Sequence, residues 1–392
     1  MKAIPYAAVV LSFAAGLWQK WPCHSAGWPY DPQLIFGELC YSDLPVLFND
    51  RGLADGYFPY ATERSFEYPV LTGHLADITA RMAWSPQSYF LINLVVLLLC
   101  TIVTVWATIK LTGRQSAGLT VALSPVLVLT GTINWDMVPV MLVSLAMLAW
   151  ARDMPALAGL AIGLGAATKL YPALLLFPLL LLTIQSRQWP RLLQTVGVAA
   201  VSWILVNLPV MVLYPAGWAV FWELNAGRRA DFGSLFYALD LLGYTLPVSL
   251  NTIGMVLFGL CLAAIAFFAP RRLEVLTLLT VAAFLITNKV YSPQYVLWLL
   301  PLAVAAGASL IVLIVWQLAE VLYWWAVWNH LSGTISDDGY SSLIFVRIGA
   351  ELLLCAAALT NRKLLPRHPV RRDRDPAGPE KIESYVASPG RV

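Results

Sequence analysis

The sequence predicts an all-α polytopic membrane protein with about twelve transmembrane helices. Hydrophobic residues make up 59% of its 392 residues and charged residues only 12%, whereas about one quarter of a soluble domain is charged. The mean hydropathy is +0.71. Apolar runs alternate with short polar clusters that contain Pro, Gly or Trp, a pattern typical of chains that cross a membrane repeatedly. This composition excludes a soluble protein.

The first apolar run covers residues 4–19, behind Lys2. It also suits the apolar region of a signal peptide, but no small-x-small cleavage site follows, so we interpret it as an uncleaved first span. Two later runs, 155–168 and 171–185, are short enough to be tilted, broken or re-entrant. The other predicted spans are 87–110, 116–133, 137–151, 191–213, 246–269, 273–287, 295–307, 309–328 and 342–360.

Cationic residues near alternate span ends predict the orientation. They are Lys110, Arg114, Arg152, Arg187, Arg191, Arg271, Arg272 and those of the tail from Arg362. The positive-inside rule makes this side cytoplasmic, with both termini there and the protein in the cytoplasmic (inner) membrane. Residues 1–361 form one transmembrane domain, and the basic, Pro-rich tail 362–392 is predicted to be disordered. The tail can serve as a topology signal or bind anionic lipid.

The first outer loop, residues 20–86, carries two cysteines and two notable acids. Cys23 and Cys40 would form a disulfide if the loop faces an oxidising compartment, although the sequence cannot supply the distance between them. Asp43, in "YSDLP", starts an amphipathic stretch that runs to Leu53 and suits a helix along the membrane surface. Two interpretations of Asp43 stay open: a helix cap, or a proton acceptor whose pKa is raised by partial burial.

Glu67, in "FEYPV", is the next candidate acid. It can pair with a cation such as Arg64, bind acceptor hydroxyls or remain solvated. Asn134 and Asp136, in "NWD", are interpreted as the start of a helix, because Asn suits the N-cap and an acid suits the positive end of the helix dipole.

Beyond the first outer loop, four cations lie close to span ends on the outer side, against the charge bias: Lys169, Arg228, Arg229 and Lys289. Their neighbours are aromatic and hydroxyl residues, which suits binding of a lipid phosphate. Snorkelling at the membrane interface is the alternative. The candidate substrate-binding residues are Glu67, Tyr68, Lys169, Tyr171, Arg228, Arg229, Lys289, Tyr291, Gln294 and His330.

Several familiar site motifs are absent from the sequence. It has no P-loop, no Gly-rich dinucleotide motif, no Cys/His pattern with zinc spacing and no nucleic-acid-binding motif. We therefore expect no nucleotide-driven pump, no zinc enzyme and no nucleic-acid partner. We also see no acidic pair that suits a metal, so we expect neither a metal ion nor another cofactor.

Several motifs taken in order resemble a known family. They are "YSDL" at 41–44, "EYPVLTG" at 67–73, "NWDMVPVMLVSLAMLAWAR" at 134–152, "GLGAATKLYPALLLFPLLL" at 163–181 and "YSPQYVLWLLP" at 291–301. The sequence resembles the actinobacterial integral-membrane glycosyltransferases of family 87, which belong to the GT-C class and use polyprenyl-phosphate sugars. The resemblance covers residues 5–360 and implies a GT-C-like bundle whose outer loop carries the active site.

The resemblance implies an inverting glycosyltransferase with Asp43 as catalytic base. The donor would be a polyprenyl-phosphate sugar, mannose first and arabinofuranose second, and the acceptor a lipid-linked glycan at the outer membrane face. Lys169, Lys289 and one or both of Arg228 and Arg229 would stabilise the leaving phosphate.

Three other functions compete with this hypothesis. A secondary transporter needs ionisable residues within the membrane, and Glu320 and Glu351 fall inside predicted spans, with Arg347 one turn before the second. A lipid-binding or lipid-flipping protein, or a catalytically dead relative that acts as a scaffold, would have the same composition.

Overall fold

The computed structural model describes residues 3–61, 66–244 and 249–360. Within these ranges nearly every element is a helix, and the single sheet pairs two short strands. Helices satisfy their own backbone hydrogen bonds, which lipid cannot do. The predicted tail 362–392 lies outside the described residues, as does Arg64.

Five helices are long and apolar enough to cross a membrane: α6 (Pro86–Thr112), α12 (Trp189–Leu213), α15 (Leu250–Phe268), α18 (Leu310–Leu331) and α19 (Asp337–Thr360). Six shorter apolar segments accompany them: α1 (Ile4–Gln19), α9 (Met137–Ala151), α10 (Pro155–Ala166), η1 (Tyr171–Leu175) with α11 (Leu176–Ser186), α16 (Leu273–Thr287), and η2 (Pro293–Tyr295) with α17 (Val296–Ala305). These segments correspond to all the predicted spans except 116–133. The prediction of an all-α polytopic membrane protein is confirmed.

The predicted span 116–133 was wrong as one continuous helix. It is divided into α7 (Gln115–Ala122) and α8 (Pro125–Thr130). Ser124 between them has an extended backbone, with φ −65° and ψ 125°. The cause is Pro125, because a proline ring clashes with a helical residue before it.

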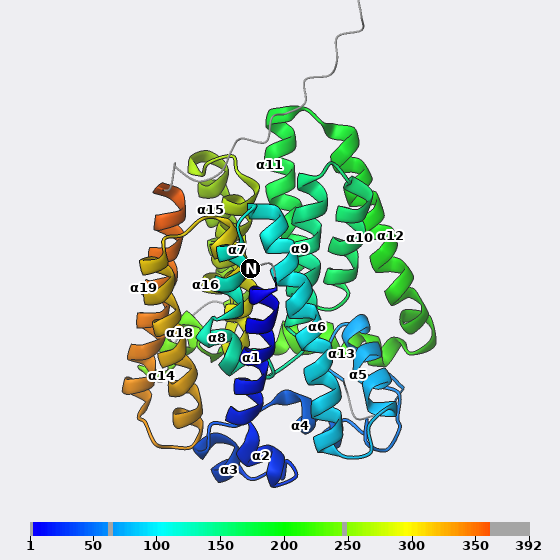
Figure 1. The fold of residues 1–392 in the computed structure, drawn as a ribbon, viewed down its shortest axis with the longest axis vertical. Coiled ribbons are helices and arrows are strands. Elements are labelled where there is room, and N and C mark those ends of the chain that lie inside the picture. Colours follow the sequence, from blue (N-terminus) through cyan, green and yellow to red (C-terminus); the bar gives the residue numbers. More distant parts are fainter. Residues whose placement is uncertain (1–2, 62–65, 245–248, 361–392) are drawn as a thin grey trace, which may run out of the picture. The chain divides into compact units, whose positions relative to one another are not determined.

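The segment predicted as the first outer loop, residues 20–86, contains four short helices: α2 (Trp21–Ser25), α3 (Pro32–Gly37), α4 (Asp43–Asp50) and α5 (Val70–Arg81). Figure 1 shows them towards one end of the helical bundle, where α1 ends and α6 begins. The amphipathic stretch predicted to reach Leu53 ends as a helix at Asp50. One face of α4 is buried through Leu44, Leu47 and Phe48.

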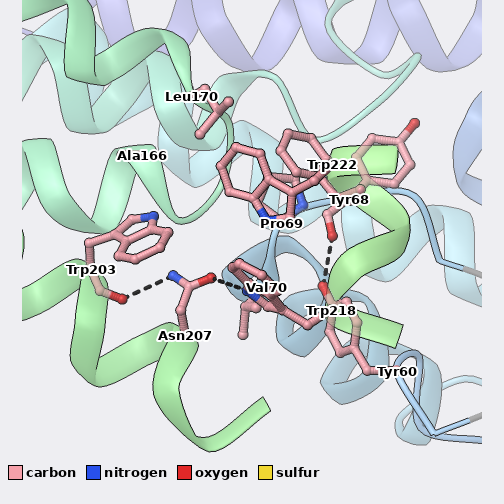
Figure 2. A pocket seen from close by; sticks show the side chains of 11 residues that line it. Tyr60, Tyr68, Pro69, Val70, Ala166, Leu170, Trp203, Asn207, Trp218 and Trp222 are labelled. Carbon is pink, nitrogen blue, oxygen red and sulfur yellow. Dashed lines mark hydrogen bonds between the residues drawn. The ribbon is translucent and has the colours of Figure 1, made fainter. Parts of the chain in front are cut away.

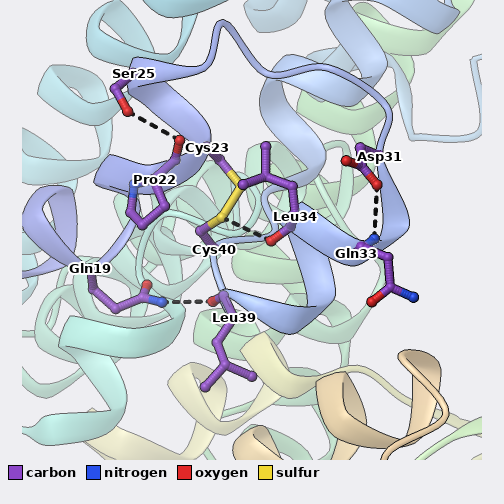
Figure 3. Close-up of a disulfide and its surroundings, with 9 residues drawn as sticks. All are labelled: Gln19, Pro22, Cys23, Ser25, Asp31, Gln33, Leu34, Leu39 and Cys40. Atoms are coloured by element: carbon purple, nitrogen blue, oxygen red, sulfur yellow. Dashed lines mark hydrogen bonds between the residues drawn. A yellow bond between two sulfur atoms is a disulfide. The ribbon is translucent and has the colours of Figure 1, made fainter.

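The disulfide that the sequence left open is formed. Cys23 and Cys40 are bonded, with their Cα atoms 5.8 Å apart (Figure 3). Both side chains are fully buried. The bond ties α2 to the segment that leads into α4.

Two segments far apart in the sequence meet in the parallel sheet. Strand β1 (Asp231–Phe232) pairs with β2 (Val290–Tyr291). Helix α13 (Pro215–Gly227) precedes β1 and α14 (Leu235–Leu241) follows it. The sheet therefore brings the loop after α13 beside the loop after α16.

Helices α16 and α17 form the centre of the core. Every residue of α17 is buried, as expected for a helix that is apolar all round. Close packing elsewhere depends on glycine: a Cβ atom on Gly163 of α10 would collide with the Ala199 carbonyl of α12. Small residues at such contacts let membrane helices approach closely.

Candidate active site

Asp43 occupies the first position of α4, but it does not cap the helix. Ser42 is the N-cap: its hydroxyl accepts a hydrogen bond from the Leu44 backbone N–H at 3.3 Å and donates one to the Thr132 carbonyl at 2.8 Å. The Asp43 backbone N–H donates to the Ile133 carbonyl at 2.8 Å. The Asp43 carboxylate is thereby left free for other contacts, which removes the cap interpretation.

Both carboxylate oxygens of Asp43 accept a hydrogen bond. The Tyr41 hydroxyl donates to Oδ1 at 2.6 Å, and Asn134 Nδ2 donates to Oδ2 at 2.5 Å. Burial raises the pKa of Asp43 above its ordinary value, while these two hydrogen bonds and the charge of Lys169 oppose the rise. A carboxylate with a raised pKa is a better proton acceptor near neutral pH than an ordinary one.

Asn134 connects Asp43 to its surroundings. Its Nδ2 lies 2.7 Å from the Tyr68 hydroxyl, and its Oδ1 accepts the Trp135 backbone N–H at 2.6 Å. The side chain is almost fully buried, with 1% exposed. Helix α9 begins only at Met137, so the interpretation of Asn134 as a helix cap was wrong.

Asp136 and Lys169 form the second part of the site. Lys169 Nζ lies 2.7 and 2.9 Å from the two carboxylate oxygens of Asp136. Asp136 is fully buried, and the Trp298 indole N–H donates to its Oδ1 at 2.6 Å. Asp136 stands at the N-cap position of α9 but makes no capping hydrogen bond. Burial lowers the pKa of Lys169, but the charge and hydrogen bonds of Asp136, with the charges of Tyr295 and Asp43, together raise it above its ordinary value.

Three stacked aromatic rings lie beside Lys169. The Trp298 ring lies between Tyr171 and Tyr295, with centroids 4.0 and 4.2 Å away. Lys169 Nζ is 5.0 Å from the Tyr295 ring centroid, a cation–π distance. The Tyr171 hydroxyl and Gln294 Oε1 are buried without a hydrogen-bond partner among the described residues. Of the sequence candidates, Tyr171 lies in this aromatic wall.

The β1–β2 pairing brings the predicted cations Arg228 and Lys289 near each other. Arg228 pairs with Asp231 at 2.6 Å and lies within electrostatic range of Tyr68 and Tyr295. Lys289 Nζ donates to the Ala226 carbonyl at 3.2 Å. Burial and the charge of Arg228 lower the pKa of Lys289. Arg229 is exposed.

Other sequence candidates have different partners. Glu67 is held by Arg51 through two hydrogen bonds of 2.9 Å each, so its pairing cation in the structure is Arg51. His330 stacks on Tyr340 with ring centroids 4.3 Å apart. Its Nδ1 lies 3.8 Å from Asp337. No described contact joins His330 to Asp43 or Lys169.

Tyr291 belongs to a buried ionic cluster and not to the surface of the site. Its hydroxyl donates to Glu320 at 2.9 Å, and the Arg347 guanidinium lies 3.6 Å from its ring centroid. Arg347 pairs with Glu351 at 2.7 Å and donates to the Gly233 carbonyl at 3.1 Å. The two acids lie in α18 and α19, as predicted. The cluster holds the β1–β2 pair in place, because Tyr291 lies in β2 and Arg347 bonds Gly233, the residue after β1.

A small pocket with mostly aromatic walls adjoins Tyr68. Figure 2 shows its side chains, which come from the first outer loop, the α10–η1 segment, α12 and α13. Asn207 links α12 to α13 in the pocket wall. Its Oδ1 accepts a hydrogen bond from the Trp218 indole N–H at 3.1 Å, and its Nδ2 donates one to the Trp203 carbonyl at 2.9 Å. The Tyr60 hydroxyl donates to the Tyr68 carbonyl at 2.9 Å. The full lining is Tyr60, Tyr68, Pro69, Val70, Ala166, Leu170, Trp203, Asn207, Trp218, Phe221 and Trp222.

Residues 66–287 match the model of glycosyltransferase family 87. The chain belongs to this family. The matched segment contains Asn134, Asp136, Lys169 and Arg228, whereas Asp43 precedes it. The chain is therefore a glycosyltransferase-family membrane protein that crosses the bilayer several times.

Two solved structures are similar at low identity. One is ArnT from Cupriavidus metallidurans bound to undecaprenyl phosphate, with TM-score 0.48, 14% identity and coverage of 89% of this chain and 77% of that chain. The other is the Archaeoglobus fulgidus oligosaccharyltransferase in the apo form, with TM-score 0.36, 13% identity and coverage of 91% of this chain and 56% of that chain. No curated protein sequence matches the chain.

The disulfide gives a testable prediction for the site. The Cys23–Cys40 bond closes a loop of the chain just before Tyr41 and Asp43. The double variant Cys23→Ser/Cys40→Ser should be about 3 kcal/mol less stable, because its unfolded chain is no longer constrained. We expect a lower melting temperature for the purified protein in detergent. The half-buried free thiol Cys261 supplies the control, since Cys261→Ser should melt like the wild type. Equal melting of the double variant would contradict the prediction.

Proposed function

We propose that the protein is an inverting glycosyltransferase that moves a sugar from a polyprenyl-phosphate donor to a lipid-linked glycan at the outer face of the cytoplasmic membrane. The observation that supports this most directly is the Asp43 carboxylate, held by Tyr41 and Asn134, at the same end of the bundle as the Asp136–Lys169 ion pair. Mannose is the first candidate sugar and arabinofuranose the second, both from the family resemblance.

In the proposed reaction, Asp43 takes the proton of the acceptor hydroxyl. The acceptor oxygen forms a bond to the anomeric carbon from one side while the bond from that carbon to the phosphate oxygen breaks on the other. The anomeric configuration inverts, and polyprenyl phosphate leaves with the bonding electron pair. Phosphate is a competent leaving group, so the reaction needs no general acid, and we propose that it needs no metal ion.

Lys169 is the cation best arranged to assist the leaving phosphate. Two of its three ammonium protons are directed at the Asp136 oxygens, 2.7 and 2.9 Å away, which leaves one for a ligand. Its side chain is 12% exposed, and we propose that an incoming phosphate contacts its ammonium. Arg228, Arg229 and Lys289 are proposed to add positive charge from the β1–β2 side. Preorganised cations of this kind stabilise charge that develops in a transition state.

The aromatic pocket beside Tyr68 suits an amphipathic substrate. Trp and Tyr side chains combine apolar surface with a polar edge and concentrate where a membrane meets water. We propose that Glu67, Tyr68, Gln294 and His330 contact the donor or acceptor at its margins. Tyr291 would act indirectly, because it is fully buried.

Sugar transfer by the purified protein tests the proposal. The protein, reconstituted in liposomes with lipids extracted from its host membrane as acceptors, would receive radiolabelled polyprenyl-phosphate mannose. A labelled glycolipid that is absent from protein-free liposomes is the expected result. If mannose gives no product, the arabinofuranose donor is used next. No product from either donor would contradict the proposed transfer and favour a lipid-binding or transport protein.

A further inference from the structure

Lys20 is a buried cation that the proposed reaction does not use. It directly follows α1, and its backbone N–H donates to the Gly16 carbonyl at 3.1 Å. Its side chain is 0% exposed. Its Nζ has no hydrogen-bond partner among the described residues. A buried ammonium without a partner is unfavourable, so Lys20 carries a cost that its local packing does not explain.

The residues around Lys20 are tied to the segment that leads to Asp43. Gln19 Nε2 donates to the Leu39 carbonyl at 2.6 Å, and Cys23 is bonded to Cys40 (Figure 3). These two links hold Lys20 against residues 39–40. The charge of Asp43 raises the pKa of Lys20 against the larger, opposite effect of burial, so the two groups lie within electrostatic range of each other.

Among the described residues, the other groups that surround Asp43 are uncharged or belong to ion pairs, as Glu67 does with Arg51. Tyr41, Asn134 and Tyr68 contribute neutral hydrogen-bonding groups. The nearby charges of Asp136 and Lys169 act on Asp43 with opposite signs and neutralise each other in their ion pair. Within the part of the chain that the structure describes, Lys20 is thus a cation near Asp43 that no carboxylate neutralises through a hydrogen bond.

We propose that Lys20 is a positioning residue for Asp43, whose ammonium charge favours the ionised carboxylate that accepts the proton. This inference rests on the proposed function, because it assigns Lys20 a role in the same site. Residues that break local stability rules concentrate at functional sites, which accounts for a buried, unpaired lysine in this position.

The charge of Lys20 should matter on the acid side of the pH profile. Burial lowers the pKa of Lys20 to about 7, although Asp43 opposes the change. Below that pH the ammonium is charged and stabilises the Asp43 carboxylate. Removal of the charge therefore makes Asp43 easier to protonate, and the acid limb of the activity profile moves to higher pH by about one unit.

The test compares Lys20→Met with Lys110→Met, which removes an exposed cation at the C-terminal end of α6. Transfer activity is measured between about pH 5 and about pH 9. At each pH the donor concentration is varied in steps of about tenfold. For Lys20→Met we expect about tenfold lower activity on the acid limb, convergence with the wild type at alkaline pH, and a melting temperature equal to or above that of the wild type. Lys110→Met should change neither the profile nor the melting temperature.

Two results of this comparison would overturn the inference. One is an unchanged profile for Lys20→Met. Another is an equal loss of activity at every pH together with a lower melting temperature, because that is what a purely structural residue would give. If Lys20→Met does not fold, Lys20→Gln takes its place, since glutamine is polar and uncharged.

A second measurement is independent of sugar transfer. Infrared difference spectra of wild type and Asp43→Asn identify the carboxyl band of Asp43, whose titration is then followed in Lys20→Met. A titration at higher pH supports the inference even if no donor is turned over, and an unshifted titration overturns it. Absence of transfer by the wild type would contradict only the proposed function.

Discussion

Replacing Asp43 with Asn should reduce sugar transfer about a thousandfold, within the range that a positioned general base contributes. The asparagine side chain has almost the same shape, and its oxygen can still accept from Asn134 Nδ2. Its amide can donate to the Tyr41 hydroxyl, which accepts as well as donates. The variant therefore keeps the local structure and loses the group that takes the proton. Initial transfer rates of the purified variants, at equal protein, measure the effect.

Two control variants separate the base from its surroundings. Tyr41→Phe removes the 2.6 Å hydrogen bond to Asp43 but keeps the carboxylate, so we expect about a tenfold loss, the equivalent of one such bond. Glu67→Gln loses the charge that pairs with Arg51 but keeps a polar group for contacts at the margin of the substrate, so it should retain most activity. Equal rates for wild type and Asp43→Asn would remove Asp43 as the base. A large loss in Glu67→Gln alone would direct the search there.

The fold was largely readable from the sequence because lipid imposes a simple rule on hydrophobic length. Runs such as 137–151 and 273–287 reappear as helices with the same bounds. The failure at 116–133 had a visible cause, since Pro125 lies inside the run and breaks it. Hydropathy averages over a window and overlooks a single proline.

The sequence named part of the candidate site, and the residues that it did not name as candidates depend on long-range contacts. Asp43 was a candidate because it starts an amphipathic stretch and because the family resemblance makes it the base, and Lys169 because a cation near an outer span end needs a reason. Asn134 and Asp136 were assigned to a helix start, because their neighbours along the chain were enough to explain both residues. Their partners lie elsewhere: Asn134 bonds Asp43 across 91 residues, and Asp136 bonds Trp298 across 162.

Lys20 and Tyr291 also show that the local sequence does not reveal burial by distant segments. Lys20 ends the first span, where a lysine is expected to reach water, yet the folded outer loop buries it completely. Tyr291 follows a cation in a polar interval and was a candidate for substrate contact. The sheet instead directs its hydroxyl to Glu320. Burial by a distant segment changes the role of a residue without any change in its neighbours along the chain.

Removing both members of the Asp136–Lys169 ion pair should restore the stability that a single replacement costs, but should not restore the rate of transfer. Lys169→Met leaves the fully buried Asp136 carboxylate without its cation, and breaking a buried pair in this way costs about 3–5 kcal/mol. Asp136→Asn removes the acid and leaves Lys169 unpaired, so this variant should also be less stable than the wild type. The double variant Asp136→Asn/Lys169→Met has no unpaired charge and should recover most of the lost melting temperature.

Transfer activity should not recover with stability. If Lys169 stabilises the leaving phosphate, both Lys169→Met and the double variant should be at least about a hundredfold slower than the wild type. Melting temperatures and transfer rates of the four proteins form a double-mutant cycle, which isolates the coupling between the two residues. Strong coupling in stability, with a loss in rate that follows Lys169 alone, is the expected pattern. Recovery of both properties in the double variant would mean that the pair only holds α9 and α10 together and that phosphate is bound by Arg228 and Lys289.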